Sequence, residues 1–179
     1  MKIIAGFAAV TLLPAFAFAG PADFKTGPII ENFGPVAAVP AAQTLPESAH
    51  LKVSFDTATG SDGDALNKTL ESAARFINMH AAAGVAPGNI EVAVVIHGGA
   101  AFDLLTNEAH KARKDGADNP NIALIAALTK ANTRIILCGQ TAAYRDITKT
   151  DLLPSVELAL SAMTAHAQLQ QGGYTLNPF

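Results

Sequence analysis

Residues 90–99, IEVAVVIHGG, place the tightest restriction on the fold of this chain. They are mostly continuous, apolar and β-branched, which is typical of a strand that is buried on both faces of a parallel sheet. Residues 134–138, RIILC, form a second such run, and residues 50–56, HLKVSFD, alternate apolar and polar side chains like a strand. The chain therefore has to supply helices that cover a parallel sheet.

The segment between the strands at 50–56 and 90–99 has apolar residues at helical spacing. Four apolar residues recur at steps of four, three and four: Leu70, Ala74, Ile77 and Ala81. Asp64 or a neighbour is expected to cap this helix, and Gly84 to end it.

The segment between the strands at 90–99 and 134–138 is predicted to contain two helices. A short one covers residues 100–105, and the polar residues that follow are interpreted as a helix end and a loop. Asn119 and Pro120 are predicted to be the N-cap and the first position of a second helix, which leads to the strand at 134–138.

The last third of the chain is compatible with one long helix or with a strand, a helix and a strand. We favour a strand at Val156–Leu160, a helix at Ser161–Gln171 and a strand at Tyr174–Leu176. Strands that alternate with helices predict an α/β fold, a three-layer α/β/α sandwich around a mainly parallel sheet of about five strands.

The first nineteen residues have the layout of a secretory signal peptide. Lys2 forms a positively charged n-region, an apolar stretch follows, and small residues allow cleavage after Ala19 or, less well, after Ala17. A retained membrane anchor is the alternative, but the apolar stretch is shorter than the roughly 20 residues of a spanning helix and contains Pro14. We therefore expect an exported, periplasmic protein that has no membrane attachment after cleavage.

Residues 20–49 are expected to form an extended N-terminal arm that lies on the domain, or that is partly disordered. They show little periodicity and contain several glycines and five prolines: Pro21, Pro28, Pro35, Pro40 and Pro46. Residues 50–179 then form one domain of ordinary size.

The charge of the chain argues against nucleic acid as a partner. The formal net charge is −3, from 12 Lys and Arg against 15 Asp and Glu. Cleavage would remove Lys2 and leave 11 against 15, or −4. There is no basic stripe with interleaved aromatic residues. Because only 15% of the residues are charged, we expect a homo-oligomer that covers part of its apolar surface.

Cys138 is the single cysteine, and it lies where a strand meets a Gly-Gln-Thr turn. Exported proteins usually pair their cysteines in disulfides, so a single thiol suggests an intermolecular bond, a reactive group or simple burial. Sites in parallel α/β sheets form at the carboxyl ends of the strands. His97, followed by Gly98 and Gly99, ends another strand and is the second candidate.

Helix amides and an imidazolium would both favour a thiolate at Cys138. A short helix through residues 141–144 would direct its N–H groups at the sulfur, and His97 would add its charge if the two strands are neighbours. The alternative is structural, because a lone cysteine on an apolar strand is often a small buried hydrophobe.

Other residue patterns lack the spacing that their chemistry needs. Residues 97–99, HGG, resemble an oxyanion loop, but the chain has no G-x-S-x-G element. Asp56, Asp62 and Asp64 do not match the EF-hand spacing, so we expect a solvated loop. The five histidines show no zinc-site spacing, and no nucleotide-binding loop is present. We expect no metal and no cofactor.

Several segments resemble the DsrE/DsrF-like sulfur-relay family, in its exported branch. They are ARFINMHAAAGV, VVIHGGAAFDLL, NPNIALIAALTKANTRIILCGQTAAYRDI and LLPSVELALSAMTAHAQLQQGGYTLNPF. The resemblance covers roughly residues 50–179. It implies a five-stranded parallel sheet between helices, assembly as trimers or hexamers, and a persulfide on a cysteine after a central strand. Cys138 has that position, and Gly139, Arg145 and Ile147 match a C-G-x5-R-x-I pattern.

The first functional hypothesis is a periplasmic sulfur carrier, or sulfurtransferase-like protein. Its partner would be a small sulfur compound or a sulfur donor or acceptor protein. Cys138 would attack a sulfane sulfur, hold it as a persulfide and release it to an acceptor thiol. His97 is the second expected catalytic residue, and the expected ligand-binding residues are Gly98, Gly99, Gly139, Gln140, Thr141, Tyr144 and Arg145. This hypothesis predicts an exposed sulfur with a lowered pKa.

The second hypothesis is a non-catalytic oligomeric protein that binds a small ligand near His97 and Cys138. Cys138 then only fills space, and its replacement by alanine leaves assembly and ligand binding unchanged. A cysteine hydrolase is a third, poorer option, since it needs an Asp or Asn that orients His97 and that the sequence cannot place.

Overall fold

The computed structural model describes residues 20–178 except 41, 43 and 47. The predicted signal peptide lies outside the described residues. The elements occur in this order: η1 (Pro21–Asp23), β1 (Leu51–Thr57), α1 (Lys68–Ala82), η2 (Pro87–Asn89), β2 (Ile90–Ile96), η3 (Gly98–Leu104), α2 (Asn107–Arg113), α3 (Ile122–Lys130), β3 (Arg134–Cys138), α4 (Gly139–Tyr144), η4 (Lys149–Asp151), β4 (Val156–Ala159), α5 (Ala162–Gln171) and β5 (Thr175–Asn177).

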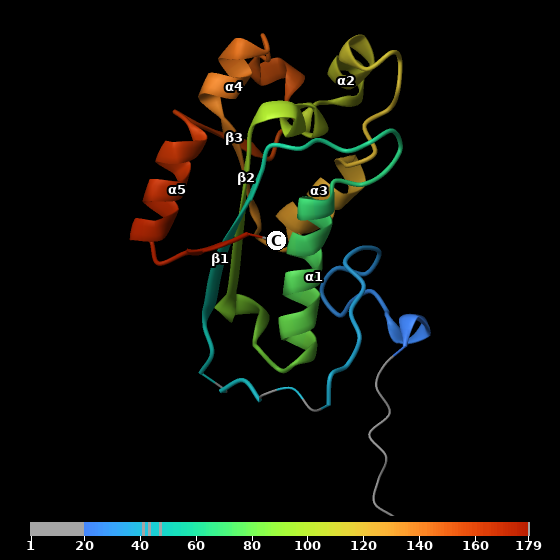
Figure 1. The fold of residues 1–179 in the computed structure, drawn as a ribbon, viewed down its shortest axis with the longest axis vertical. Coiled ribbons are helices and arrows are strands. Elements are labelled where there is room, and N and C mark those ends of the chain that lie inside the picture. The colour runs from blue at the N-terminus through green and yellow to red at the C-terminus, as the bar shows by residue number, and fades with distance from the viewer. Residues whose placement is uncertain (1–19, 41, 43, 47, 179) are drawn as a thin grey trace, which may run out of the picture.

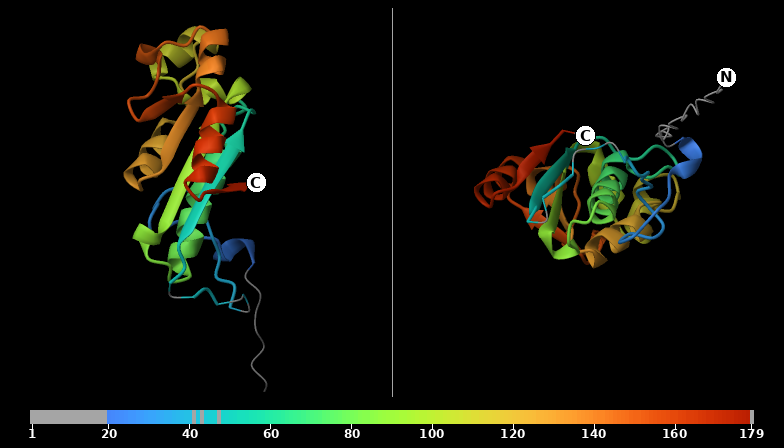
Figure 2. Two further views of the ribbon diagram at one scale, coloured as in Figure 1. Left: turned by 90° about the vertical axis from the view of Figure 1, so that its left-hand side faces the viewer. Right: turned by 90° about the horizontal axis from the view of Figure 1, so that it is seen from below.

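A parallel sheet of five strands in the order β4-β3-β2-β1-β5 forms the centre of the molecule. Helices α1 and α3 cover one face of the sheet and α5 covers the other (Figures 1 and 2). This arrangement confirms the predicted α/β sandwich. Because β2 and β3 are direct neighbours, the strand ends that carry His97 and Cys138 lie side by side.

The apolar runs of β2 and β3 pack against helices on both sides. Val94, Ile96 and Leu137 belong to the larger core beneath α1 and α3. Val95 and Ile136 face the other way, toward α5. Full burial of such a side chain contributes roughly 1.5–3 kcal/mol, which explains why these strands contain almost no polar residues.

Two helices begin at residues other than those predicted. Asn67, not Asp64, caps α1, and its side-chain oxygen accepts from the N–H groups of Thr69 and Leu70. The N-cap position of α3 is Asn121, two residues after the predicted cap. Asn119 accepts from the Asn121 N–H at 2.9 Å and so acts from outside the helix.

Helix α2 occupies a stretch that the sequence suggested to be a helix end and a loop. Thr106 caps it by accepting from the N–H of Ala109 at 3.3 Å, and Ala109 and His110 are buried. Burial of this one face therefore stabilises a short helix that the polar composition concealed.

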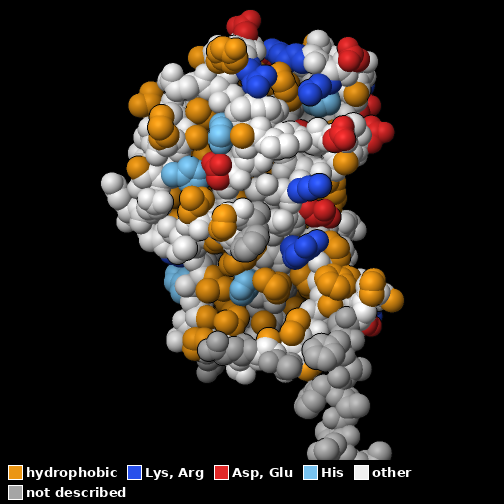
Figure 3. Space-filling view, in the orientation of Figure 1, with side chains coloured by type: hydrophobic (Ala, Val, Ile, Leu, Met, Phe, Trp, Pro, Cys, Tyr) orange, Lys and Arg blue, Asp and Glu red, His pale blue; other side chains and the backbone are white. Residues whose placement is uncertain are grey.

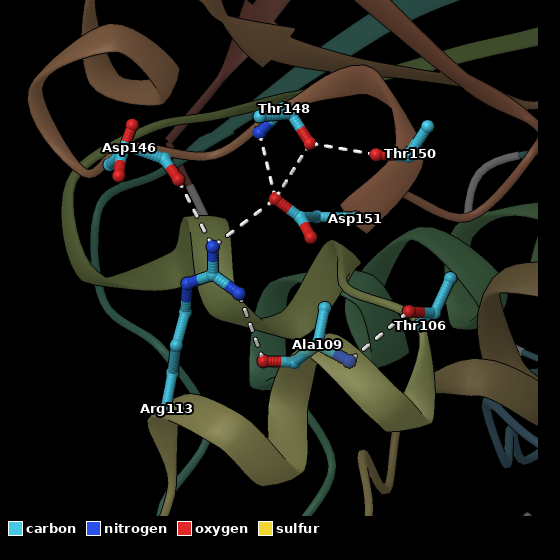
Figure 4. Close-up of polar contacts among 7 residues, drawn as sticks. All are labelled: Thr106, Ala109, Arg113, Asp146, Thr148, Thr150 and Asp151. Carbon is cyan, nitrogen blue, oxygen red and sulfur yellow. Dashed lines mark hydrogen bonds and ion pairs between the residues drawn. The ribbon is translucent and has the colours of Figure 1, made fainter.

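Contacts around Asp151 fix α2 to the segment that follows α4 (Figure 4). Arg113 donates from Nη2 to Asp151 at 3.1 Å and to the carbonyl of Asp146 at 3.0 Å. The N–H and the hydroxyl of Thr148 both donate to the same carboxylate at 2.9 Å. The loop beyond α4 is thereby attached to the rest of the domain.

The N-terminal segment packs against α1 through the buried side chain of Asn78. Its oxygen accepts from the N–H groups of Ile29 and Ile30, and its amide donates to the carbonyls of Ile30, Phe33 and Gly34. Ile30 is itself part of the core. One asparagine thus satisfies several backbone groups of the segment.

Among the described residues, no helix has the length and apolar character needed to span a membrane.

Candidate active site

Cys138 is the last residue of β3 and also the N-cap of α4. The helix therefore begins at Gly139, two residues earlier than predicted, directly beside the sulfur. Ile136 packs toward α5, so Cys138, two residues further along the strand, lies on the same face of the sheet. The residue is buried, with 6% of its surface exposed, so the expectation of an exposed sulfur is wrong.

Hydrogen-bond donors from two helices surround the sulfur of Cys138. Burial in apolar surroundings by itself raises the pKa of the thiol. The hydroxyl of Thr141 and the backbone N–H groups of Thr141, Ala162 and Gln140 outweigh this effect, so the pKa is lower than that of an ordinary thiol. The N–H of Ala162 belongs to the first turn of α5, and the others belong to α4.

Thr141 also joins the two strand ends. The N–H of Gly98 donates to the Thr141 hydroxyl oxygen at 3.2 Å. The same hydroxyl is one of the groups that lower the pKa of the Cys138 thiol. Thr141 thus links the backbone just after β2 to the surroundings of the sulfur.

Two glycines allow the backbones to approach closely here. A Cβ on Gly139 would collide with the carbonyl oxygen of Ala159. Gly98 has a φ of +55°, and a Cβ there would lie 3.0 Å from the Ala58 oxygen. The predicted glycines thus shape the site through their lack of a side chain.

His97 lies in the same row of the sheet as Cys138. In the β2–β3 register Ile96 is opposite Leu137, so the next residue of each strand, His97 and Cys138, continue the row. Val95 faces α5, and so does His97. Within the described part of the chain, no hydrogen bond joins the His97 ring to the sulfur, and the ring is directed to Asp56 instead.

Asp56 accepts from two histidines, which sequence reasoning did not predict. Its Oδ2 lies 3.2 Å from Nε2 of His97, and its Oδ1 lies 2.7 Å from Nε2 of His166 on α5. These three residues are called the histidine–aspartate cluster below. Figure 3 shows histidine side chains beside an acidic one in the upper part of the face near α5. Asp56 belongs to β1, so its assignment to a solvated loop is wrong.

The sequence contains little that would predict the histidine–aspartate cluster. Asp56 and His166 are 110 positions apart, and only the folded sheet brings α5 over the end of β1. The alternation in residues 50–56 places Asp56 on the face opposite Phe55, which was the one available hint. The Asp that a triad-like His97 would need is therefore present.

The remaining predicted residues lie at the margin of the site. Gln140 contributes its backbone N–H to the sulfur, while its side chain donates to the Leu160 carbonyl at 3.4 Å. The guanidinium carbon of Arg145 lies 4.8 Å from the centre of the Phe102 ring. Tyr144 is 88% exposed. Gly99 packs against Ala58.

Several large apolar side chains near Cys138 face solvent. Tyr144 ends α4, Leu158 and Leu160 belong to edge strand β4 and the residues after it, and Met163 lies in the first turn of α5. All four are exposed. We call them the β4-edge patch. These residues come from β4 and α4, which directly adjoin Cys138, and from the start of α5.

The described residues include no group of three or more His, Cys, Asp or Glu side chains that could hold a metal ion.

Comparisons with known proteins agree with this architecture. The model of the DsrE/DsrF-like family matches residues 52–178. A protein of unknown function from Methanobacterium thermoautotrophicum, MTH1491, has 16% sequence identity and a TM-score of 0.51, with 72% of this chain and 99% of that chain covered. The ychN protein from E. coli has 18% identity and a TM-score of 0.52 over the same shares of the two chains. These two likenesses show the fold. No curated protein matches the chain. Because the family model spans the sheet, its helices and Cys138, the chain belongs to the DsrE/DsrF-like family.

Proposed function

We propose that this protein is a sulfur carrier, or sulfurtransferase-like protein, that holds sulfane sulfur as a persulfide on Cys138. The supporting observation is the position of Cys138 at the N-cap of α4, where hydrogen bonding from the Thr141 hydroxyl and from the N–H groups of Thr141, Ala162 and Gln140 outweighs burial and lowers the pKa of its thiol. Donors of this kind favour an anionic sulfur, which is the nucleophilic form of cysteine. Membership in the DsrE/DsrF-like family suggests a fold of the sulfur-relay type, and the surroundings of Cys138 supply a chemistry that suits it.

Loading requires one displacement. The Cys138 thiolate attacks the outer sulfur of a donor R–S–SH, a new S–S bond forms to Cys138, and the donor's S–S bond breaks. The electron pair of that bond leaves on R–S⁻, which takes up a proton. Unloading is the reverse displacement by an acceptor thiol. The chain has only one cysteine, so no internal thiol competes for the persulfide.

The burial of Cys138 favours a slender donor. With 6% of the residue exposed, a hydropolysulfide or a similar small sulfur compound reaches the sulfur more easily than a folded protein surface does. A protein partner would have to present its own thiol on an extended or mobile end.

The test is sulfur loading measured by mass spectrometry on the folded protein. We expect native protein to gain one sulfur atom from a polysulfide donor, and Cys138→Ser to gain none. Capture at the same site in the folded state only, with loss of sulfur on addition of an acceptor thiol, supports the carrier. If Cys138 takes up sulfur only after denaturation, the alternative of a binding protein with a structural cysteine is correct.

The β4-edge patch supports assembly of several copies. Leu158 and Leu160 lie at the sheet edge and Tyr144 and Met163 on helices α4 and α5, and a monomer would leave these four large apolar side chains in water. We expect a homo-oligomer, a trimer or hexamer, and Leu160→Asp is expected to shift it toward the monomer in sedimentation experiments. A wild-type chain that sediments as a monomer at high concentration would refute assembly.

Export is part of the same proposal. The layout of residues 1–19 supports cleavage after Ala19, which gives a periplasmic chain that begins at Gly20. N-terminal sequencing of the protein from a periplasmic fraction tests this. An intact Met1 on membrane-bound protein would support a retained anchor.

A further inference from the structure

The histidine–aspartate cluster has a defined pattern of hydrogen bonds. An ionised carboxylate only accepts hydrogen bonds, so both histidine nitrogens that face Asp56 must carry a hydrogen. This places the proton of His97 and that of His166 on Nε2. The Asp56 carboxylate is therefore held at both oxygens, one by His97, which directly follows β2, and one by His166 from α5.

The two histidines differ in what surrounds their other nitrogen. Nδ1 of His166 is buried and has no hydrogen-bond partner among the described residues, so a proton placed there would have no acceptor. His166 therefore serves as a fixed donor from Nε2. His97 is more open, with 32% of its side chain exposed against 17% for His166. Its Nδ1 makes no hydrogen bond within the described part of the chain and is left as an acceptor.

We infer that Asp56 and His166 are positioning residues for His97, holding its proton on Nε2 so that its Nδ1 accepts the proton of an incoming acceptor thiol. The titratable groups that face His97 are Asp56 from β1, His166 through Asp56 from α5, and Cys138 in the same row of β3. In a neutral imidazole, a neighbouring acceptor keeps the proton on the ring nitrogen that faces it, and the other nitrogen then has no proton. This inference rests on the proposed sulfur carriage.

The step that His97 performs is the release of sulfur. An acceptor thiol R–SH gives its proton to Nδ1 of His97, and the resulting R–S⁻ attacks the outer sulfur of Cys138–S–SH. A new S–S bond forms between the acceptor sulfur and the transferred sulfur, which gives R–S–SH, and the S–S bond to Cys138 breaks. The electron pair returns to the Cys138 sulfur as a thiolate, which the N–H groups of α4 and α5 stabilise. The new imidazolium and this thiolate carry opposite charges, so the net charge of the site is unchanged.

The first experiment is nitrogen-15 NMR of the histidine rings in the mature chain, which distinguishes the two neutral tautomers. We expect His97 and His166 both to carry the proton on Nε2. Asp56→Asn cannot accept from both rings, so the His97 signal is expected to become that of a tautomer mixture. His166→Leu is expected to act in the same direction, while His166→Gln, whose side-chain nitrogen donates from a similar position, restores the single tautomer of His97.

His50→Leu is the matched control. His50 also contacts a carboxylate, Glu91 at 2.9 Å, but it lies at the opposite end of the sheet. The inference is overturned if wild-type His97 carries its proton on Nδ1, or if Asp56→Asn leaves the His97 signals as they are in wild type.

The second experiment measures sulfur release from loaded Cys138 to a small thiol. Removal of His97 by alanine is expected to slow release by roughly 100-fold, the lower range for loss of a general base, and Asp56→Asn by about tenfold. Release that is slow in His97→Ala but of wild-type rate in Asp56→Asn overturns the positioning role. If Cys138 never loads sulfur in any variant, the proposed function fails, and the NMR result alone decides whether the cluster orients His97.

Discussion

Thr141→Val removes one hydroxyl from the sulfur site while nearly preserving the volume of the side chain. The variant loses the donor that Thr141 offers to Cys138 and the acceptor that it offers to the N–H of Gly98. A hydrogen bond to a charged group contributes roughly 1.5–3 kcal/mol. At about 1.4 kcal/mol per factor of ten, the ionisation equilibrium of Cys138 shifts from thiolate toward thiol by roughly 10- to 100-fold.

The rate of alkylation falls less than the thiolate fraction. A more basic thiolate is a better nucleophile, and the Brønsted coefficient of about 0.4–0.5 returns close to half of the loss on a logarithmic scale. We therefore expect alkylation of folded Thr141→Val at neutral pH to be about three- to tenfold slower than in wild type.

The pH dependence of the alkylation rate shows in which direction the substitution changes the pKa of Cys138. Alkylation requires the thiolate, and the pKa of Cys138 is lowered in the fold, so the wild-type rate should rise at a lower pH than for an ordinary thiol. In Thr141→Val the rise should move to higher pH. Thr129→Val is the matched control, since it removes a hydroxyl that donates to the Ile125 carbonyl at 2.8 Å on the far side of the sheet. Equal rates and equal pH profiles in Thr141→Val and wild type would refute the account of the thiolate.

Three further substitutions test the framework by measured free energies of unfolding. Gly139→Ala places a Cβ against the Ala159 carbonyl and should destabilise the fold by about 1–3 kcal/mol in urea; an unchanged midpoint contradicts this contact. Hydrogen bonds from Thr148 lower the pKa of Asp151, so its stabilisation is present above the unfolded pKa and lost as pH falls through the folded value. Asp151→Asn should thus cost about 1 kcal/mol at neutral pH and less in acid, and a penalty independent of pH argues against this origin. Asn78→Ala leaves backbone groups of the N-terminal segment unpaired and should cost roughly 1–3 kcal/mol, with faster proteolysis of residues 25–36; equal protease resistance would contradict it.

The central strands of the sheet could be predicted from the sequence because strands that are buried on both faces have continuous apolar sequences. Residues 90–96 and 134–138 show that pattern and form β2 and β3. Helix α2 was hidden for the opposite reason: only Ala109 and His110 are buried, so its sequence is polar and its stability comes from tertiary contacts. The caps of α1 and α3 differ from the predicted residues because Asn67 and Asn121 interact with each other across the fold. The N–H of Asn67 donates to the side-chain oxygen of Asn121 at 2.8 Å, and no local sequence pattern predicts this contact.

The candidate site likewise has one part that the sequence predicted and one part that it did not. Cys138 and the N–H groups beside it follow one another along the chain, so a turn after a strand predicted them. The N–H of Ala162 and the pair of Asp56 and His166 come from other elements, and their approach depends on the strand order. Sequence periodicity does not contain strand order, and this half of the site required the structure.

The most direct measurement follows labelled sulfur through one cycle on the folded protein. Polysulfide carrying a sulfur isotope is added, excess donor is removed, and a small acceptor thiol is supplied while mass spectrometry follows both species. The account predicts one labelled sulfur per chain on Cys138, its complete delivery to the acceptor, and no uptake by Cys138→Ser. Uptake that survives in Cys138→Ser, or a folded wild-type chain that takes up no sulfur, would contradict it.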